Sequence, residues 1–217
     1  MKRQQTCSLW LAASLGLASA TAVLAQTPSQ VPGSPAAKVS PAGARLTPTA
    51  QVGGQTVQLN GKGTRYRAVV RVYDVGLYTT AKVNSVEQLA ALTGPKRLHL
   101  ITLRDLTGDS LGVAMVKGMQ DNAPAGERIK LIAHMDRLSR IFGAEQLAPA
   151  GTVLTIDYVP SQGTMFFLNG ESKGEIVTDP AYFVAVARIW LGPKPADAAL
   201  KDALLGIETR RPESAGG

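Results

Sequence analysis

The stretch LNGKGTRYRAVVRVYDVGLY occupies residues 59–78 and carries the most distinctive local pattern of this chain. Its pattern Gly61-x-Gly63-x-Arg65 predicts a tight turn, because glycine has no side chain to oppose positive φ angles. An arginine that directly follows such a turn is held on a stiff scaffold, and its planar guanidinium suits a carboxylate. Arg65 is therefore the first candidate for contact with an anionic ligand.

Strand signals surround this turn. Val and Tyr recur after Arg65, and Asp74-Val75-Gly76 predicts a bulge between two strands. Residues 96–104 are largely apolar on both faces, which is typical of a central strand. The predicted strands are 55–60, 65–73, 76–80, 96–104, 151–159 and 164–168, with a last short strand that follows the Asn169-Gly170 turn and ends at Val177.

Helix signals separate and follow the strands. Ser85 opens a capping box, Thr107 is an N-cap candidate, and Asp179-Pro180 is an N-cap with proline in the first turn. The predicted helices are 85–92, one after Thr107, one from Pro124 to Gly143, 179–191 and 195–205. We expect the third of these to bury Ile129, Ile132, Ala133, Leu138, Ile141 and Phe142. This order predicts an α+β domain whose antiparallel sheet carries helices on one face.

The ends of the chain differ from this domain in composition. Residues 1–25 have a positive start, an apolar run and small side chains before Ala25, so they predict a cleaved secretory signal peptide and a periplasmic or secreted protein. Residues 26–50 are rich in Pro, Ala, Ser and Thr and predict a flexible tether. The folded domain is expected over residues 51–207, and residues 208–217 form a loose tail.

Composition restricts the chemistry. Cys7 lies in the signal segment, so the mature chain would have no cysteine and neither a disulfide nor a thiolate site. His99 and His134 stand far apart in sequence, which gives a metal site little support, and no cofactor is expected. Removing Lys2 and Arg3 lowers the net charge from +7 to +5. The basic residues are dispersed, so nucleic acid is not an expected partner. The positive net charge favours an anionic ligand or a negatively charged membrane surface as partner.

Several strings, taken in order, resemble the chalcone isomerase superfamily, and specifically its bacterial, exported chalcone isomerase-like branch. They are Leu59-Asn60-Gly61-Lys62-Gly63-Thr64-Arg65, Val72-Tyr73-Asp74-Val75-Gly76-Leu77-Tyr78, Leu106-Thr107-Gly108, Pro149-Ala150-Gly151 and Asn169-Gly170. The resemblance implies an open-faced antiparallel sheet with a helical layer on one face and a ligand cleft between them. The superfamily includes ring-closing enzymes and non-catalytic fatty-acid-binding members, in which an arginine and a tyrosine hold the carboxylate.

The resemblance assigns Arg65 to that common arginine. At positions where the enzymes use a strand threonine and a helix tyrosine and asparagine, this chain has Tyr73, Leu111 and Gly118. A hydroxyl residue of a later helix corresponds to a position near Phe183. Because these donors are missing, the resemblance favours a non-catalytic protein over an enzyme.

The leading hypothesis is an exported protein that binds a small amphipathic anion, of which a fatty acid is one example. Its predicted ligand-binding residues are Arg65, Tyr73, Leu111, Met115, Met119 and Phe183. Tyr73 and the two methionines are also compatible with plain core packing. Two alternatives stay open: an intramolecular lyase or isomerase of unknown substrate that uses the same cleft, and a periplasmic module that docks a protein or a membrane-bound complex.

Overall fold

The computed structural model describes residues 45–143 and 147–207. Within them the chain forms one seven-stranded sheet in which every neighbouring pair is antiparallel, in the order β1-β2-β3-β4-β5-β6-β7. The strands are β1 (Thr49–Val52), β2 (Gln55–Arg67), β3 (Val70–Thr79), β4 (Lys96–Thr102), β5 (Val153–Val159), β6 (Gly163–Leu168) and β7 (Glu171–Val177). The helices are α1 (Val86–Ala91), α2 (Gly108–Asn122), α3 (Arg128–Gly143), α4 (Pro180–Leu191) and α5 (Ala198–Leu204).

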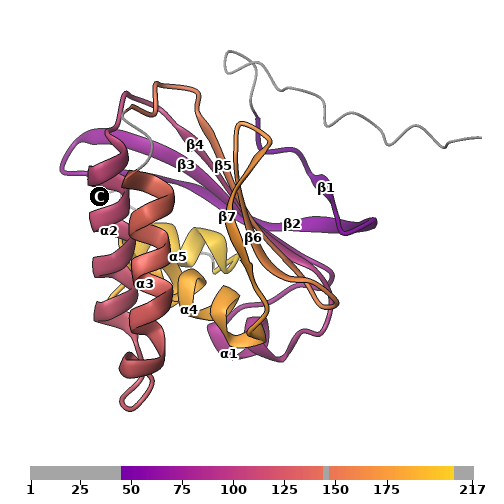
Figure 1. Ribbon diagram of the computed structural model, residues 1–217. Helices are drawn as coiled ribbons and strands as arrows, with labels where there is room; N and C mark the ends of the chain where they lie inside the picture. Colours follow the sequence, from indigo (N-terminus) through magenta and orange to yellow (C-terminus); the bar gives the residue numbers. More distant parts are fainter. Residues whose placement is uncertain (1–44, 144–146, 208–217) are drawn as a thin grey trace, which may run out of the picture. The chain divides into compact units, whose positions relative to one another are not determined.

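The helices form a layer on one face of the open sheet (Figure 1). Helix α4 lies at the centre of this layer, and it contacts the sheet at β5 and β6 as well as α1, α2 and α5. It is buried almost all round, whereas α3 packs on α2 and reaches β7. The main core therefore joins sheet residues such as Leu98 and Ile156 to helix residues such as Phe183 and Trp190. The predicted α+β class, with helices on one face of an antiparallel sheet, is confirmed.

The opposite face of the sheet carries a smaller cluster. Val52, Val57, Tyr78 and Val159 are buried together there, and Leu46 packs against them. The Tyr78 hydroxyl donates a hydrogen bond to the Thr47 carbonyl at 2.9 Å. Strand β1 begins at Thr49, so regular structure starts slightly before the predicted boundary at residue 50. The rest of the predicted signal peptide and tether, up to residue 44, and the tail after residue 207 lie outside the described residues.

Most predicted element ends are confirmed by their caps. Ser85, Thr107 and Asp179 accept hydrogen bonds from the backbone of α1, α2 and α4 respectively. The Asn169-Gly170 turn joins β6 to β7, and both residues have positive φ angles, 51° and 84°. This is the backbone that a two-residue hairpin of this composition favours.

The turn predicted at Gly61 and Gly63 is wrong. Both residues lie inside β2, neither has a positive φ angle, and the hairpin turn occurs later, at Ala68 and Val69. The glycines are needed for close packing instead: a Cβ on Gly61 would lie 2.1 Å from the Ala203 carbonyl oxygen of α5. The chain irregularity also falls elsewhere, since β2 shifts register at 59–61 and 65–66, while the predicted bulge at 74–76 is absent from β3.

The predicted buried face of α3 is partly wrong. Ile129 is 82% exposed and Ile132 is 62% exposed, whereas Leu131, Leu138 and Phe142 are buried. The apolar residues of this helix extend beyond the width of its contact with α2 and β7. The buried residues Leu131, Met135, Leu138 and Phe142 follow the i, i+4, i+7, i+11 spacing of one helix face, and Ile129 and Ile132 lie outside that face.

Candidate ligand-binding site

Arg65 and Tyr73 are directly opposite one another on neighbouring strands. Their Cα atoms are register partners between β2 and β3, so their side chains leave the sheet on the same face. Both line one cavity between the sheet and the helical layer. Tyr73 packs against the main core, while the Arg65 side chain stays 26% exposed.

Asp197 anchors the Arg65 guanidinium. Arg65 Nη1 lies 3.4 Å from Asp197 Oδ2, and the same oxygen accepts the backbone N–H of Tyr66 at 3.3 Å. The other carboxylate oxygen accepts the Leu200 N–H at 3.2 Å, which makes Asp197 the N-cap of α5. Arg65 Nη1 also donates to the Tyr66 carbonyl oxygen. The start of α5 thus fixes the arginine while several guanidinium N–H groups stay available to a ligand.

Trp190 determines the orientation of the Tyr73 hydroxyl. The indole Nε1–H donates to Tyr73 Oη at 2.8 Å, so the tyrosine oxygen is an acceptor there and its own proton is free to be donated elsewhere. Burial raises the pKa of Tyr73 above its usual 10, although the Trp190 hydrogen bond and the nearby Arg65 charge oppose that rise. Tyr73 is therefore a neutral hydrogen-bond donor at every physiological pH.

The cavity beside these residues has a volume of about 600 Å³ and a mainly apolar lining. Its walls come from β2 to β5, from α2 and α4, and from the segment before α5. The apolar lining residues are Val72, Leu100, Leu106, Leu111, Val113, Ala114, Met115, Leu154, Ile189, Trp190, Pro195 and Ala196. Its charged lining residues are Arg65, Arg67, Lys117, Asp121 and Lys194. Lys117 and Asp121 pair with each other at 2.6 Å, so the remaining charges are predominantly positive.

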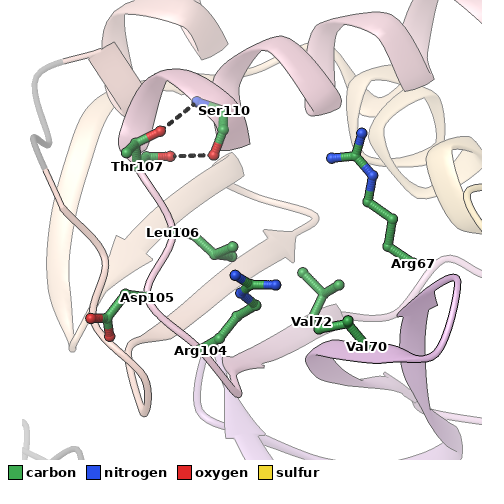
Figure 2. A pocket seen from close by; sticks show the side chains of 8 residues that line it. All are labelled: Arg67, Val70, Val72, Arg104, Asp105, Leu106, Thr107 and Ser110. Carbon is green, nitrogen blue, oxygen red and sulfur yellow. Dashed lines mark hydrogen bonds between the residues drawn. The ribbon is translucent and has the colours of Figure 1, made fainter.

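A second hollow adjoins the first and is more polar. It has a volume of about 530 Å³ and shares Arg67, Val72, Leu106 and Ser110 with the cavity of Arg65 and Tyr73. Figure 2 shows Arg67 and Arg104 entering it from different parts of the chain, with Thr107 and Ser110 hydrogen-bonded to each other at the start of α2. The shared residues make this hollow the outer part of the same site.

Comparison with known proteins places the fold in a family. A family model described as chalcone isomerase-like matches residues 38–206. The chain belongs to this chalcone isomerase-like family. No curated protein matches it. Among solved structures, the fatty-acid binding protein AtFAP1 of Arabidopsis thaliana is similar at 12% sequence identity and a TM-score of 0.49, and the match covers 72% of this chain and 95% of that one.

Within this chalcone isomerase-like domain, four of the six predicted ligand-binding residues line the same cavity. They are Arg65, Tyr73, Leu111 and Met115. Met119 and Phe183 are each only 1% exposed and belong to the core, and neither lines the cavity. Because a helix turns roughly 100° per residue, Gly118 comes back under Leu111, whereas Met119 is turned by roughly 80° from Leu111. Gly118 accordingly lines the cavity together with Leu111.

Asp197, Arg67 and Trp190 were not among the predicted ligand-binding residues. The contact between Asp197 and Arg65 joins residues 132 positions apart, and an N-cap aspartate gives no sign of a second partner. Arg67 lies between a register shift at 65–66 and the turn at Ala68, so strand alternation alone does not predict on which face its side chain lies. The cavity lining shows that Arg65 and Arg67 border the same space.

The two histidines lie away from this cavity. His99 is on β4 with its Nε2 atom buried and unbonded, and burial, assisted by the Arg97 charge, lowers its pKa to about 4. The His134 ring packs 4.5 Å from the ring of Tyr182. Within residues 45–143 and 147–207, no group of three or more His, Cys, Asp or Glu side chains is placed to hold a metal ion. In the same part of the chain, no helix is long and apolar enough to cross a membrane.

Proposed function

We propose that this protein binds a small amphipathic carboxylate, such as a fatty acid, and does not catalyse a reaction. The observation that supports this most directly is the cross-strand pair of Arg65 and Tyr73 at the wall of a mainly apolar cavity. Two polar donors side by side at the wall of a mainly apolar space suit a ligand with one anionic end.

The carboxylate would take hydrogen bonds from both residues. The 3.4 Å separation between Arg65 and Asp197 is long for a charged hydrogen bond, so the pair orients the guanidinium without using all of its donors. Tyr73 would donate its proton because its oxygen already accepts from Trp190. A buried hydroxyl held in this way requires little reorganisation on binding.

The body of the ligand would lie along the apolar wall. Leu111 and Met115 of α2 face Leu100 and Leu154 of the sheet across the cavity. A volume of about 600 Å³ lies within the range usual for small-molecule sites, roughly 300–1,000 Å³. The cavity can therefore enclose a hydrocarbon or aromatic body.

The lining offers little for general acid–base catalysis. Neither histidine borders the cavity, and the lining carboxylate Asp121 is already paired with Lys117. Leu111 and Gly118 do border it, at the positions where the resemblance assigns the enzymes' tyrosine and asparagine. Neither Leu111 nor Gly118 has a side-chain donor, so the two donors that the resemblance assigns to the enzymes are missing at those positions.

Native mass spectrometry of protein purified from its own host tests the proposal. We expect a co-purifying acid in the wild-type protein and its loss in Arg65→Ala. Arg137→Ala is the matched control, because Arg137 also pairs with a carboxylate at 3.4 Å, to Glu175, but lies outside the cavity. The absence of any bound acid, together with no thermal shift across a panel of straight-chain acids, would refute the proposal. Turnover of a chalcone or related enone that depends on Arg65 would support the isomerase alternative instead.

We also propose that the protein is exported, as a member of the bacterial exported branch of its family, and works in the periplasm. The composition of residues 1–25 supports this proposal. Mass measurement of the mature N-terminus in a periplasmic fraction should give a chain that begins near Gln26. An intact Met1 in the cytoplasmic fraction would contradict it.

A further inference from the structure

The hairpin between β2 and β3 ends in an exposed apolar tip, formed by residues 66–70. Arg67 and Val70 are the last paired residues, and Ala68 and Val69 make the turn. Val69 is 92% exposed, Tyr66 44% and Val70 43%. Among the described residues, Val69 is the most exposed of the large hydrophobic side chains.

The geometry of the turn does not explain why Ala68 and Val69 occupy it. Ala68 has a φ angle of 53°, where glycine or asparagine is preferred, and two-residue hairpins usually carry Asn-Gly or Gly at this place. The chain thus tolerates some backbone strain and places a β-branched apolar residue at the apex, where solubility favours polar ones. An exposed apolar apex between Arg67 and Arg71 indicates contact with something apolar.

Arginines surround the tip. Arg67 and Arg71 flank the turn, and Arg104 lies with Arg67 and Val70 around the outer hollow in Figure 2. Arg71 pairs with Asp74 at 3.7 Å, and the nearby Asp105 carboxylate accepts the Ala150 N–H. Within the described part of the chain, Arg67 and Arg104 have no ion-pair partner. The surface around the tip is therefore basic as well as apolar at its apex.

We propose that this hairpin tip docks into the surface of an anionic lipid bilayer. Val69 and Val70 would enter the apolar boundary, Tyr66 would lie at the headgroup level, and the arginines would contact lipid phosphates. A protein partner fits less well, because a stable protein interface buries about 800 Å² on each side, far more than one hairpin apex offers. The outer hollow opens beside the tip, so docking would bring the mouth of the cavity to the membrane.

Co-sedimentation with vesicles tests this proposal, using protein purified from its host so that the N-terminus is the native one. We expect binding to phosphatidylethanolamine–phosphatidylglycerol vesicles, and weaker binding to phosphatidylcholine vesicles or at high salt. Val69→Asp should weaken binding at least about tenfold, since it puts a charge at the position that would enter the bilayer. The double variant Arg67→Gln/Arg104→Gln should lose most of the preference for anionic vesicles.

Ile129→Asp is the matched control, because Ile129 is 82% exposed on α3 and lies in neither hollow. It should bind vesicles like the wild-type protein, and the melting temperatures of both aspartate variants should stay near the wild-type value. In Val69→Trp, the added tryptophan should show a blue-shifted emission when anionic vesicles are present. Failure of the wild-type protein to bind vesicles, or equal losses in Val69→Asp and Ile129→Asp, would overturn the proposal. So would a protein partner that is captured through Val69 without any vesicle binding.

Vesicle binding is measured without added cavity ligand. If native mass spectrometry finds no bound acid, the vesicle experiment still tests membrane docking. If the protein does not bind vesicles, the mass spectrometry still tests the binding of an acid.

Discussion

At the scale of single residues, the site depends on a chain of four side chains in which each fixes the next. Asp197 caps α5 and holds Arg65, Arg65 lies across the strand pair from Tyr73, and Tyr73 accepts the indole proton of Trp190. Arg65 was predicted from the glycine pattern before it and from the resemblance, whereas Tyr73 was predicted as a ligand donor from the resemblance alone. It could not identify Asp197, because nothing local to residues 195–205 indicates a partner on β2.

Tyr73→Phe should separate the role of the hydroxyl from that of the ring. The affinity for hexadecanoate, measured by calorimetry, should fall about tenfold, because one hydrogen bond to a charged group is lost. The free energy of unfolding should fall by about 1–2 kcal/mol, since the Trp190 N–H loses its acceptor.

Tyr182→Phe is the control for this change. Tyr182 is 1% exposed, and its hydroxyl donates to the His134 carbonyl at 3.4 Å, away from the cavity. It should lower stability without changing the affinity for hexadecanoate. If Tyr73→Phe binds the acid as well as the wild-type protein does, then Tyr73 does not donate to the ligand.

At the scale of elements, the close approach of α5 to β2 explains why the Gly-x-Gly pattern precedes Arg65. A Cβ on Gly61 would meet the Ala203 and Leu204 carbonyl oxygens at 2.1 and 2.5 Å, and one on Gly63 would meet Leu200 at 2.8 Å. The pattern is a packing surface for the helix whose N-cap holds the arginine. A glycine that is required for contact and one that is required for a turn look alike in a sequence, which is why the turn prediction failed.

Gly61→Ala should therefore damage both stability and the site. Moving the α5 backbone away from β2 should cost about 3 kcal/mol in the free energy of unfolding, measured by denaturant titration. It should also weaken the binding of hexadecanoate, because Asp197 moves with the helix. Gly143→Ala is the control, since a Cβ there meets only an Asp109 oxygen at 3.9 Å. Equal stabilities for the two variants would show that α5 does not need this close approach.

At the scale of the whole molecule, alternation and caps were enough to predict an antiparallel sheet with a helical layer. They predicted β4 as central and α4 with its Asp179 cap, because those features are local. The cavity was harder, because its lining comes from four strands, two helices and the segment before α5. The exposed Ile129 and the buried Met119 show the same limit: hydrophobicity states what a residue prefers, while the packing partners decide whether it is covered.

The face of the sheet opposite the helical layer contains ionisable groups that make the free energy of unfolding depend on pH. His99 is partly buried with an unbonded Nε2, and its pKa is about 4 in the folded protein against an ordinary value of 6.5. Next to it, Arg97 makes two 2.6 Å hydrogen bonds to Asp157. Burial raises the pKa of Asp157 despite those bonds, so this carboxyl acts in the opposite sense at acidic pH.

Replacing His99 should expose its part of this dependence. In the unfolded chain His99 binds a proton as the pH falls below 6.5, whereas in the folded chain it does so only near pH 4. The free energy of unfolding therefore falls progressively as the pH is lowered from 6.5 to 4. The loss should reach up to about 3 kcal/mol near pH 4, partly offset by Asp157. His99→Leu should remove this dependence and leave the Asp157 contribution, when unfolding is followed in guanidinium at a series of pH values from 7 to 4. If the stability of the variant falls in parallel with that of the wild-type protein over this range, then His99 is protonated in the folded state as readily as in the unfolded chain.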